Sequence, residues 1–458
     1  MSRPRLPVVG LILLIIVLAA GAAVGGFAVT DAARPAPPTP TIAPPPSAFR
    51  QAGSSPSPAH AGPSAPTLRA AAVTRALSPL LAAGGLGRRV RAEVLDVASG
   101  SVLFSRGGST PAAPASTAKV LTAAAVLATR GPGYRIRTTV RAGSDGAVVL
   151  VGGGDPTLSG AARGEPGAYA DAARITDLAD QLRRAHVTPT RIVVDDSLFT
   201  GPSIAPQWAP EDVPSDYASA ITAVLADGGR VGPTDVIRSA APDLAAGHRL
   251  AAALGRPKLP VQRGTARPAA RVLAGVQSAP VATLVEQMLH ASDNVIAECL
   301  ARQVALAQHR TASFAGAARA VRTVLAGLGV DPGRGLVDGS GLAASDRVTV
   351  GTLADVLRLA ATTSLQPAVR SLLAALPVAA WSGSLADRFV TGSSRTGAGV
   401  VRAKTGTLTG VSALAGTVHD RDGRLLVFAV IADRVASTSA AESALDALAA
   451  GLARCGCT

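Results

Sequence analysis

The sequence predicts an α/β (α+β) protein, in which one domain made of a sheet and covering helices closes around a long inserted segment. A hairpin pattern lies near the start of the folded body, at 88–106. Two further strand patterns lie near the end of the chain, at 411–420 and 424–433, and mixed patterns fill the interval. A sheet that takes strands from both ends of a chain requires the segment between them to form an insertion.

The elements follow in chain order. A helix is expected over 68–82, and the hairpin then turns at 98–100. A proline-punctuated loop leads to a helix over 117–130, and a strand-rich stretch follows at 134–158. The last expectations are listed together: an amphipathic helix over 169–186, a strand over 191–199, helices from about 281 onward, and a final helix over 439–455.

The N-terminal region predicts a membrane attachment. Arg3 and Arg5 precede an uncharged apolar run over 6–29, which is long enough for a bilayer span of about 20 residues. This length favours an uncleaved anchor over a signal peptide, although the alanines at 32–33 would permit cleavage. Residues 33–67 are rich in Pro, Ala and Ser, a composition typical of an extended tether.

Composition excludes several classes of function. The net charge is +14, but the arginines are scattered singly and no aromatic residues are interleaved with them, so we expect no nucleic-acid partner. An acidic cell envelope is a compatible setting. The six histidines lack metal-ligand spacing, so no metal or other cofactor is predicted. Cys299 could form one disulfide with Cys455 or Cys457, but three free thiols fit equally well.

The stretch PASTAKV holds Ser116 and Lys119, and lysine is rare in this chain. Of the 44 Lys and Arg residues only three are lysine, namely Lys119, Lys258 and Lys404. Ser and Lys three positions apart share one helical face, where a lysine of lowered pKa can take the proton of a serine nucleophile. A guanidinium stays protonated and cannot do so. Ser116 is therefore a candidate nucleophile and Lys119 its base.

A second lysine motif is VRAKTGTLTG. Alternation along this strand places Thr405 and Thr407 on one face, and Gly406 leaves room for a ligand backbone to approach. Lys404 and the two hydroxyls could then hold the carboxylate of an extended peptide. A strand end with ordinary turn chemistry is the alternative interpretation of K-T-G.

A third motif, S-D-N, lies between two helical patterns. Ser292 and Asn294 could both face a cleft, where the hydroxyl passes protons and the amide holds a substrate carbonyl. Taken alone, the same motif is an ordinary helix N-cap.

The three motifs in this order resemble those of penicillin-binding proteins and class A β-lactamases. The segments VGGGDPTL, VVDDSLFTGP, VDGSGL and VRAKTGTLTGVSALAG are similar to the D-alanyl-D-alanine carboxypeptidase and endopeptidase family, the low-molecular-mass class C penicillin-binding proteins. The similarity runs from about residue 85 to the end. It implies a β-lactamase-like transpeptidase-type domain, an antiparallel sheet flanked by helices, with an inserted mixed α/β domain. The expected organisation is a membrane anchor or signal segment (1–32), a linker (33–67), the catalytic domain in two parts (68–134 and 277–458) and the insertion (135–276).

The resemblance also implies roles for the site residues. Ser116 would attack the carbonyl between two D-alanines with Lys119 as base, while the backbone N–H groups of Ser116 and Thr407 would form the oxyanion hole. Ser292 would relay a proton and Asn294 would hold the substrate amide. Lys404 and its neighbours Thr405, Gly406 and Thr407 would form the carboxylate subsite. The implied partners are peptidoglycan stem peptides and, as covalent inhibitors, β-lactams.

Some features stand outside these roles. Ala343 occupies a position after GSGL where this family leads us to expect serine, which weakens the case for a role of that loop. Asp155, Asp195 and Asp196 are expected to satisfy turns, and Lys258 has no predicted role.

Two other functions compete with this interpretation. The first is a β-lactamase, but class A enzymes use a glutamate downstream of S-D-N to deacylate, and this chain has none between Glu298 and Glu442. The second is a cell-wall-binding module without activity, which the intact motifs disfavour. The motifs alone do not show whether the protein acts as a carboxypeptidase or as an endopeptidase.

Overall fold

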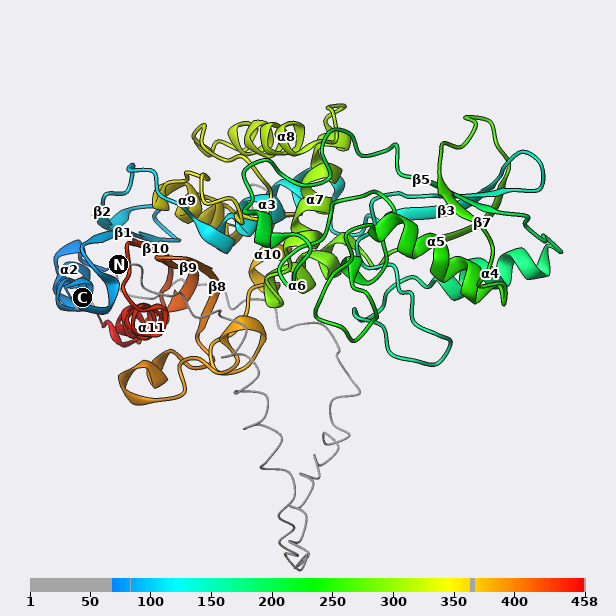
Figure 1. Cartoon of the computed structure of the whole chain (residues 1–458). Helices are drawn as coiled ribbons and strands as arrows, with labels where there is room; N and C mark the ends of the chain where they lie inside the picture. The colour runs from blue at the N-terminus through cyan, green and yellow to red at the C-terminus, as the bar shows by residue number, and fades with distance from the viewer. Residues whose placement is uncertain (1–67, 83, 363–366, 457–458) are drawn as a thin grey trace, which may run out of the picture. The chain divides into compact units, whose positions relative to one another are not determined.

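The computed structural model describes residues 68–82, 84–362 and 367–456 (Figure 1). They all lie in the second of two compact units, Pro56–Thr458. The predicted anchor and the predicted linker lie outside the described residues, and so does Cys457. Within the described part, no helix is both long enough and apolar enough to cross a membrane.

The main sheet has five strands in the order β2-β1-β10-β9-β8, and every neighbouring pair is antiparallel. Their bounds are β1 (Arg89–Asp96), β2 (Val102–Arg106), β8 (Val401–Leu408), β9 (Val411–His419) and β10 (Leu425–Asp433). The register of β1 on β10 runs from Arg89 opposite Asp433 to Asp96 opposite Leu426. Strands from the two ends of the folded body therefore pair directly, which confirms the predicted sheet.

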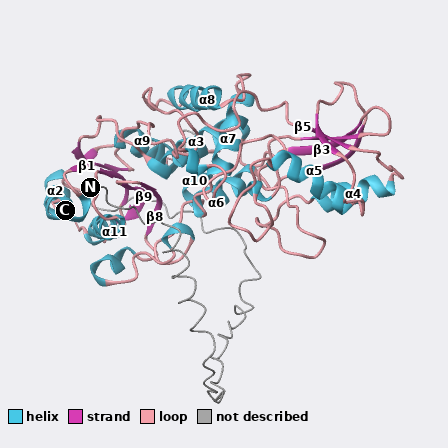
Figure 2. Cartoon of the chain, viewed as in Figure 1, coloured by secondary structure: helices cyan, strands magenta, loops and turns pink. Residues whose placement is uncertain are grey.

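Helices cover both faces of this sheet (Figure 2). One face packs against α2 (Ala70–Leu81) and α11 (Thr438–Arg454), in a core that includes Leu77, Phe428 and Leu448. The other face packs against a mainly helical layer, in a core that includes Leu121, Val427 and Leu357. That layer consists of α3 (Lys119–Arg130), α6 (Val281–His290), α7 (Asn294–Ala307), α8 (Phe314–Gly327), α9 (Val350–Ala361) and α10 (Ser371–Ala374). The abundance of alanine lets these helices pack closely.

A second sheet, in the order β6-β5-β4-β3-β7, lies in the inserted part of the chain. Strand β4 is parallel to β5 and β5 to β6, whereas β3 is antiparallel to both β4 and β7. The bounds are β3 (Arg137–Ala142), β4 (Val148–Val151), β5 (Ile192–Asp195), β6 (Val261–Arg263) and β7 (Val272–Gln277), with helices α4 (Ile175–Arg184) and α5 (Pro242–Ala253). This sheet and its helices enclose a core of their own.

Most of the elements expected from the sequence are present in the structure, but some have different bounds. The amphipathic helix expected over 169–186 is helical only as α4, because Tyr169 and the residues after it form an irregular segment that packs near α7. Neither α5 nor strands β6 and β7 were recognised in the sequence. Short one-turn helices occur at η2 (Gly84–Leu86), η3 (Ala115–Ala118), η4 (Pro210–Asp212), η5 (Asp227–Gly229), η6 (Gly383–Leu385) and η7 (Gly392–Gly397).

The thiol of Cys299 is free and buried in α7, so the structure contradicts a disulfide between Cys299 and the C-terminal cysteines. Cys455 is disulfide-bonded. Cys299 instead packs among apolar side chains, which include Trp208 and Phe314. A fully buried thiol in such a position behaves as a small hydrophobic residue.

Candidate active site

Ser116 and Lys119 meet at the start of α3. Ser116 lies in the one-turn helix η3, and Lys119 is the first residue of α3. The Nζ atom of Lys119 lies 2.9 Å from Oγ of Ser116. Ala115, just before the serine, has a left-handed backbone with φ of 48°. The predicted spacing therefore brings hydroxyl and amine into direct contact.

Lys119 is fully buried, and two oxygens hold its amine besides the serine. Nζ donates to Oδ1 of Asn294 at 2.6 Å and to the carbonyl oxygen of Ser340 at 2.8 Å. Burial lowers the pKa of Lys119 to about 8, although nearby carboxylates, Asp338 foremost, act in the opposite direction. A lysine with this pKa is poised to accept a proton near neutral pH.

The DGSGL turn supplies the carbonyl that binds Lys119. Asp338 is buried and accepts hydrogen bonds from the backbone N–H groups of Ser340 and Gly341, at 3.0 and 2.6 Å. Its other oxygen accepts from Ala343 N at 2.8 Å and from Nε1 of Trp208 at 2.9 Å. Because Ala343 contributes its backbone, the missing serine side chain does not break the turn.

Two more buried carboxyl groups lie behind the turn. Glu298 accepts from Gly339 N at 2.9 Å and pairs with Arg302 at 3.3 Å. Burial raises the pKa of Glu298 to about 7, and burial beside Asp338 raises the pKa of Asp346 to about 10. The charges of Glu298 and Asp346 both act to raise the pKa of Lys119, against the larger effect of its burial.

Lys404 of β8 is a second fully buried amine. Its Nζ donates to Oγ of Ser292 and to the carbonyl oxygen of Thr405, both at 2.9 Å. The Thr405 hydroxyl donates to Oγ of Ser384 at 2.8 Å. Burial, and next the positive charge of Lys119, hold the pKa of Lys404 well below its usual value. A bound carboxylate beside Lys404 would act in the opposite direction and raise this pKa.

Gly406 is required by the protein's own backbone, and the expectation that a ligand also approaches there stays a prediction. A Cβ at this position would lie 2.8 Å from the carbonyl oxygen of Pro114 and 3.2 Å from Cβ of Ala115. The absent side chain thus lets β8 lie against η3, where Ser116 sits. Thr407, one residue on, is exposed at the cleft.

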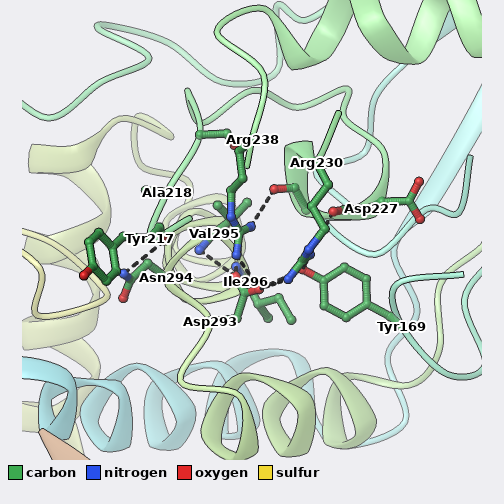
Figure 3. A network of polar contacts seen from close by, with 12 residues as sticks. Tyr169, Tyr217, Ala218, Asp227, Arg230, Arg238, Asp293, Asn294, Val295 and Ile296 are labelled. Carbon is green, nitrogen blue, oxygen red and sulfur yellow. Dashed lines mark hydrogen bonds and ion pairs between the residues drawn. The ribbon is translucent and has the colours of Figure 1, made fainter. Parts of the chain in front are cut away.

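The S-D-N motif forms the turn between α6 and α7. The backbone of Ser292 is in the left-handed conformation, with φ of 54°, and Asp293 is the N-cap of α7. Figure 3 shows Asp293 surrounded by side chains from the inserted part of the chain. Asn294 accepts from Lys119 through Oδ1, and its Nδ2 donates to the carbonyl oxygen of Tyr217 at 3.2 Å. Asn294 therefore orients the lysine in addition to facing the cleft.

A cavity of about 790 Å³ is bordered by all three motifs, through Ser116, Ser292, Asn294, Thr405 and Thr407. Lys119, Lys404 and Gly406 lie in its wall without reaching its surface. Its lining also includes residues that sequence reasoning missed, namely Tyr217, Arg230, Arg238, Ser384, Arg388 and Glu442. None of these stands in a recognisable motif. The roles of Ser340 and Asp338 beside Lys119 were also missed, although the VDGSGL segment that holds them stood out in the sequence.

The remaining sequence expectations have plain outcomes. Asp155 accepts from Thr157 and Asp195 from Ser197, so these two satisfy turns as predicted. Asp196 instead accepts the backbone N–H of Val224, which lies in a distant part of the sequence, so the prediction of a turn was wrong for this residue. Lys258 is exposed. Among the described residues, no cluster of His, Cys, Asp or Glu could hold a metal ion.

The D-Ala-D-Ala carboxypeptidase 3 (S13) family model matches residues 73–236 and 232–454, nearly the whole folded body. The chain belongs to this family. The S13 assignment confirms the resemblance drawn from the motifs, and it makes the chain a serine-type D-Ala-D-Ala carboxypeptidase. In this S13 enzyme the three motifs lie around one cleft.

Curated relatives support the S13 assignment. Carboxypeptidase Rv3627c of Mycobacterium tuberculosis is 46% identical over 401 residues, which cover 86% of each chain. Carboxypeptidase DacB of Mycolicibacterium smegmatis is 43% identical over 456 residues, which cover 98% of this chain and 96% of the relative. The crystal structure of penicillin-binding protein 4 from Haemophilus influenzae aligns with a TM-score of 0.66 at 20% identity, over 81% of this chain and 94% of that one. This likeness supports the penicillin-binding fold.

Proposed function

We propose that this S13 enzyme is an exported, membrane-anchored DD-peptidase that cleaves the terminal D-Ala-D-Ala bond of peptidoglycan stem peptides through an acyl-enzyme on Ser116. The observation that carries the proposal is the contact of 2.9 Å between the Ser116 hydroxyl and the fully buried Lys119 amine. Burial of the amine matters because only its neutral form can accept the serine proton. The export and the anchor rest on the N-terminal sequence alone.

Acylation begins when Lys119 takes the Ser116 proton and Oγ attacks the carbonyl between the two D-alanines. The backbone N–H groups of Ser116 and Thr407 stabilise the oxyanion, in a role that demands fixed donors. The close approach of β8 to η3 at Gly406 supports this, because it fixes the two backbones relative to one another.

The leaving D-alanine needs a proton on its nitrogen when the C–N bond breaks. Ser292 gives that proton and regains one from Lys404, whose amine lies 2.9 Å from its hydroxyl. Lys404, Thr405 and Thr407 bind the terminal carboxylate, and Asn294 holds the substrate amide. Water then hydrolyses the ester on Ser116: its OH joins the acyl carbon and its other proton goes back to Lys404. Lys119 returns its proton to Oγ of Ser116, so the shortened peptide leaves and both amines regain their starting states.

A fluorescent penicillin tests the acyl-enzyme. The Haemophilus influenzae protein has also been solved in complex with a β-lactam, which supports binding of this inhibitor class here. We expect the soluble body to be labelled covalently and Ser116→Ala to remain unlabelled. Label that survives Ser116→Ala would refute the nucleophile, and an unlabelled wild type would favour the inactive wall-binding module.

A β-lactamase remains the second candidate to test, because Glu442 lies at the cleft. Its carboxylate is 3.5 Å from the Thr407 hydroxyl and 3.7 Å from Arg388. Among the described residues, no hydrogen bond joins Glu442 to Ser116 or Lys119, so it is poorly placed to activate a deacylating water. We expect penicillin to remain bound to Ser116. Release of hydrolysed penicillin over many turnovers, abolished in Glu442→Gln, would establish the β-lactamase instead.

The proposal also includes endopeptidase action, the cleavage of cross-linked peptides. The cavity of about 790 Å³ leaves room beyond the three motifs, on the side of Arg388 and Glu442. Purified muropeptides give the test. Free D-alanine indicates carboxypeptidase action, and conversion of cross-linked dimers to monomers indicates endopeptidase action; intact dimers would exclude the latter.

A further inference from the structure

The backbone of the S-D-N turn is strained. Ser292 has a φ of 54°, in the left-handed region that a residue with a side chain rarely adopts. Such a conformation is unfavourable and persists only when the surroundings enforce it. The enforcing contacts therefore determine where the Ser292 hydroxyl points.

Asp293 provides the first of these contacts. One oxygen of its carboxylate, Oδ1, caps α7 by accepting from Val295 N at 2.9 Å and from Ile296 N at 3.1 Å. An N-cap of this kind requires only one carboxylate oxygen. The second oxygen, Oδ2, is left for other partners.

Oδ2 of Asp293 is held entirely by the inserted part of the chain (Figure 3). It accepts from the Tyr169 hydroxyl at 2.8 Å and from Nη2 of Arg238 at 3.0 Å, and Arg230 lies 3.7 Å away. Asp293 and Arg238 are each only 4% exposed, so water competes little for these bonds. A buried carboxylate is stable only with such partners.

The charges in this group agree with the geometry. Burial would raise the pKa of Asp293, but Arg238 and then Arg230 outweigh it and hold the pKa far below its usual value. Burial, and next Asp293, raise the pKa of Tyr169. The tyrosine therefore stays protonated and remains a donor. Tyr169 itself accepts from Arg230 at 2.7 Å, and Arg238 also donates to Gly228 O at 2.6 Å, so the donors are fixed as well.

The last residue of the motif, Asn294, is tethered to the same inserted segment. Asn294 donates to the carbonyl oxygen of Tyr217 at 3.2 Å. The chain beside Tyr217 is joined in turn to Arg238, whose backbone N–H donates to Ser215 O at 3.1 Å. The two residues that follow Ser292 in the motif are thus both anchored by the inserted segment, outside the catalytic sheet.

We infer that Tyr169 and Arg238 are positioning residues for catalysis, which act through Asp293 to hold the Ser292 hydroxyl where it protonates the leaving nitrogen. The inference rests on the proposed function, because it takes Ser292 to be the proton relay. It gives the insertion a part in the chemistry itself. A displacement of the hydroxyl by about 1 Å would cost on the order of a hundredfold in rate.

The leaving group provides a test that a purely structural role would not pass. We compare a D-Ala-D-Ala peptide with a thioester that has the same acyl group, because a thiolate departs without a proton. Tyr169→Phe and Arg238→Gln should lower kcat/KM for the peptide by about a hundredfold and for the thioester by less than about threefold. Arg238→Lys, which keeps a donor and the charge, should recover part of the loss.

Arg263→Gln is the matched control. Arg263 pairs with the buried Asp243 at 2.9 Å in the same insertion, but does not contact S-D-N. This variant should not lower kcat/KM for one substrate more than for the other. Equal losses on both substrates in the Tyr169 and Arg238 variants, or a selective loss in Arg263→Gln, would overturn the inference.

Ser292→Ala separates the inference from the function on which it rests. If Ser292→Ala reduces peptide cleavage selectively while Tyr169→Phe and Arg238→Gln do not, the relay stands and the positioning role is wrong. If Ser292→Ala reduces both substrates equally, the relay and the inference built on it both fail. Tyr169→Phe removes a single hydroxyl, and its folding is checked by its urea midpoint.

Discussion

At the scale of single residues, the burial of Lys119 implies a specific pH dependence. Its pKa is lowered to about 8, so below that value the amine is protonated and cannot accept the serine proton. The rate of acylation by penicillin should rise about tenfold per pH unit up to pH 8 and then level off. Stopped-flow labelling between pH 5.5 and 9.5 measures this, and a flat profile would contradict Lys119 as the base.

Asp338→Asn tests the cause of that pKa. The groups facing the amine are Asp338, Asp293, Glu298, Asp346 and Lys404. Among the carboxylates, Asp338 does most to raise the lysine pKa. An asparagine keeps one oxygen to accept from Ser340 N and Gly341 N, and loses the acceptor that Ala343 N uses. The midpoint of the acylation profile should therefore move to lower pH. A shift to higher pH would reject this account.

Substitution by arginine should have different effects at the two buried lysines. Lys119→Arg keeps the charge but loses the base, so acylation should fall by at least about a hundredfold. Lys404→Arg should retain part of the activity, because a cation there still binds carboxylate, with a loss of about tenfold. Second-order rate constants for penicillin acylation give the comparison. Wild-type activity in Lys119→Arg would refute its role.

At the scale of elements, the approach of β8 to η3 makes a prediction about Gly406. A Cβ there would meet the carbonyl oxygen of Pro114 at 2.8 Å, and neither backbone can move without shifting Ser116 or Thr407. Gly406→Ala should cost about 1–3 kcal/mol in stability and about a hundredfold in acylation. Urea unfolding and penicillin labelling measure the two effects.

Gly275→Ala in β7 is the matched control for a strand glycine. Its Cβ would meet only side chains, those of Arg137 at 3.4 Å and Thr139 at 3.7 Å, and it lies in the other sheet. Acylation should remain at the wild-type rate. Activity lost equally in both variants would show that Gly406 has no special effect on the site.

The elements that sequence reasoning predicted well are those with local signals. Ser116 and Lys119 are one helical turn apart, and K-T-G lies within one strand, so their spacing fixes their geometry. The contacts of Asp293 with Tyr169 and Arg238 join parts of the chain far apart in sequence, and no periodicity marks them. Whether Cys299 is paired likewise depends on which distant residues the fold brings beside it, so the sequence left its state open.

At the scale of the whole molecule, the joining of strands from both ends of the folded body in one sheet was predictable because these strands had clear patterns, whereas their order was not predicted. The inserted part was not, since β6 is only three residues long and β7 has a half-exposed pattern. The predicted domain boundaries at 135 and 276 stay predictions. The network around Asp293 nevertheless makes the insertion and the catalytic part dependent on one another for the S-D-N turn.

The buried carboxyl groups give the last prediction, which concerns the stability of the whole fold. Asp155 is 2% exposed, one of its oxygens has no hydrogen-bond partner, and burial raises its pKa to about 6 from 3.8. A raised carboxyl pKa means that the folded state binds the proton more tightly. Stability from this group is therefore complete below pH 4 and declines as the pH rises from about 4 to about 6.

Asp155→Asn removes that decline while its side-chain oxygen can still accept from Thr157. A shift of about two pKa units corresponds to roughly 3 kcal/mol. The variant should therefore gain up to about 3 kcal/mol on the wild type as the pH rises from 4 to 8. Urea unfolding at the two pH values gives this difference, in which any pH-independent cost of the amide cancels. A stability difference that does not change with pH would mean that Asp155 titrates normally in the folded protein.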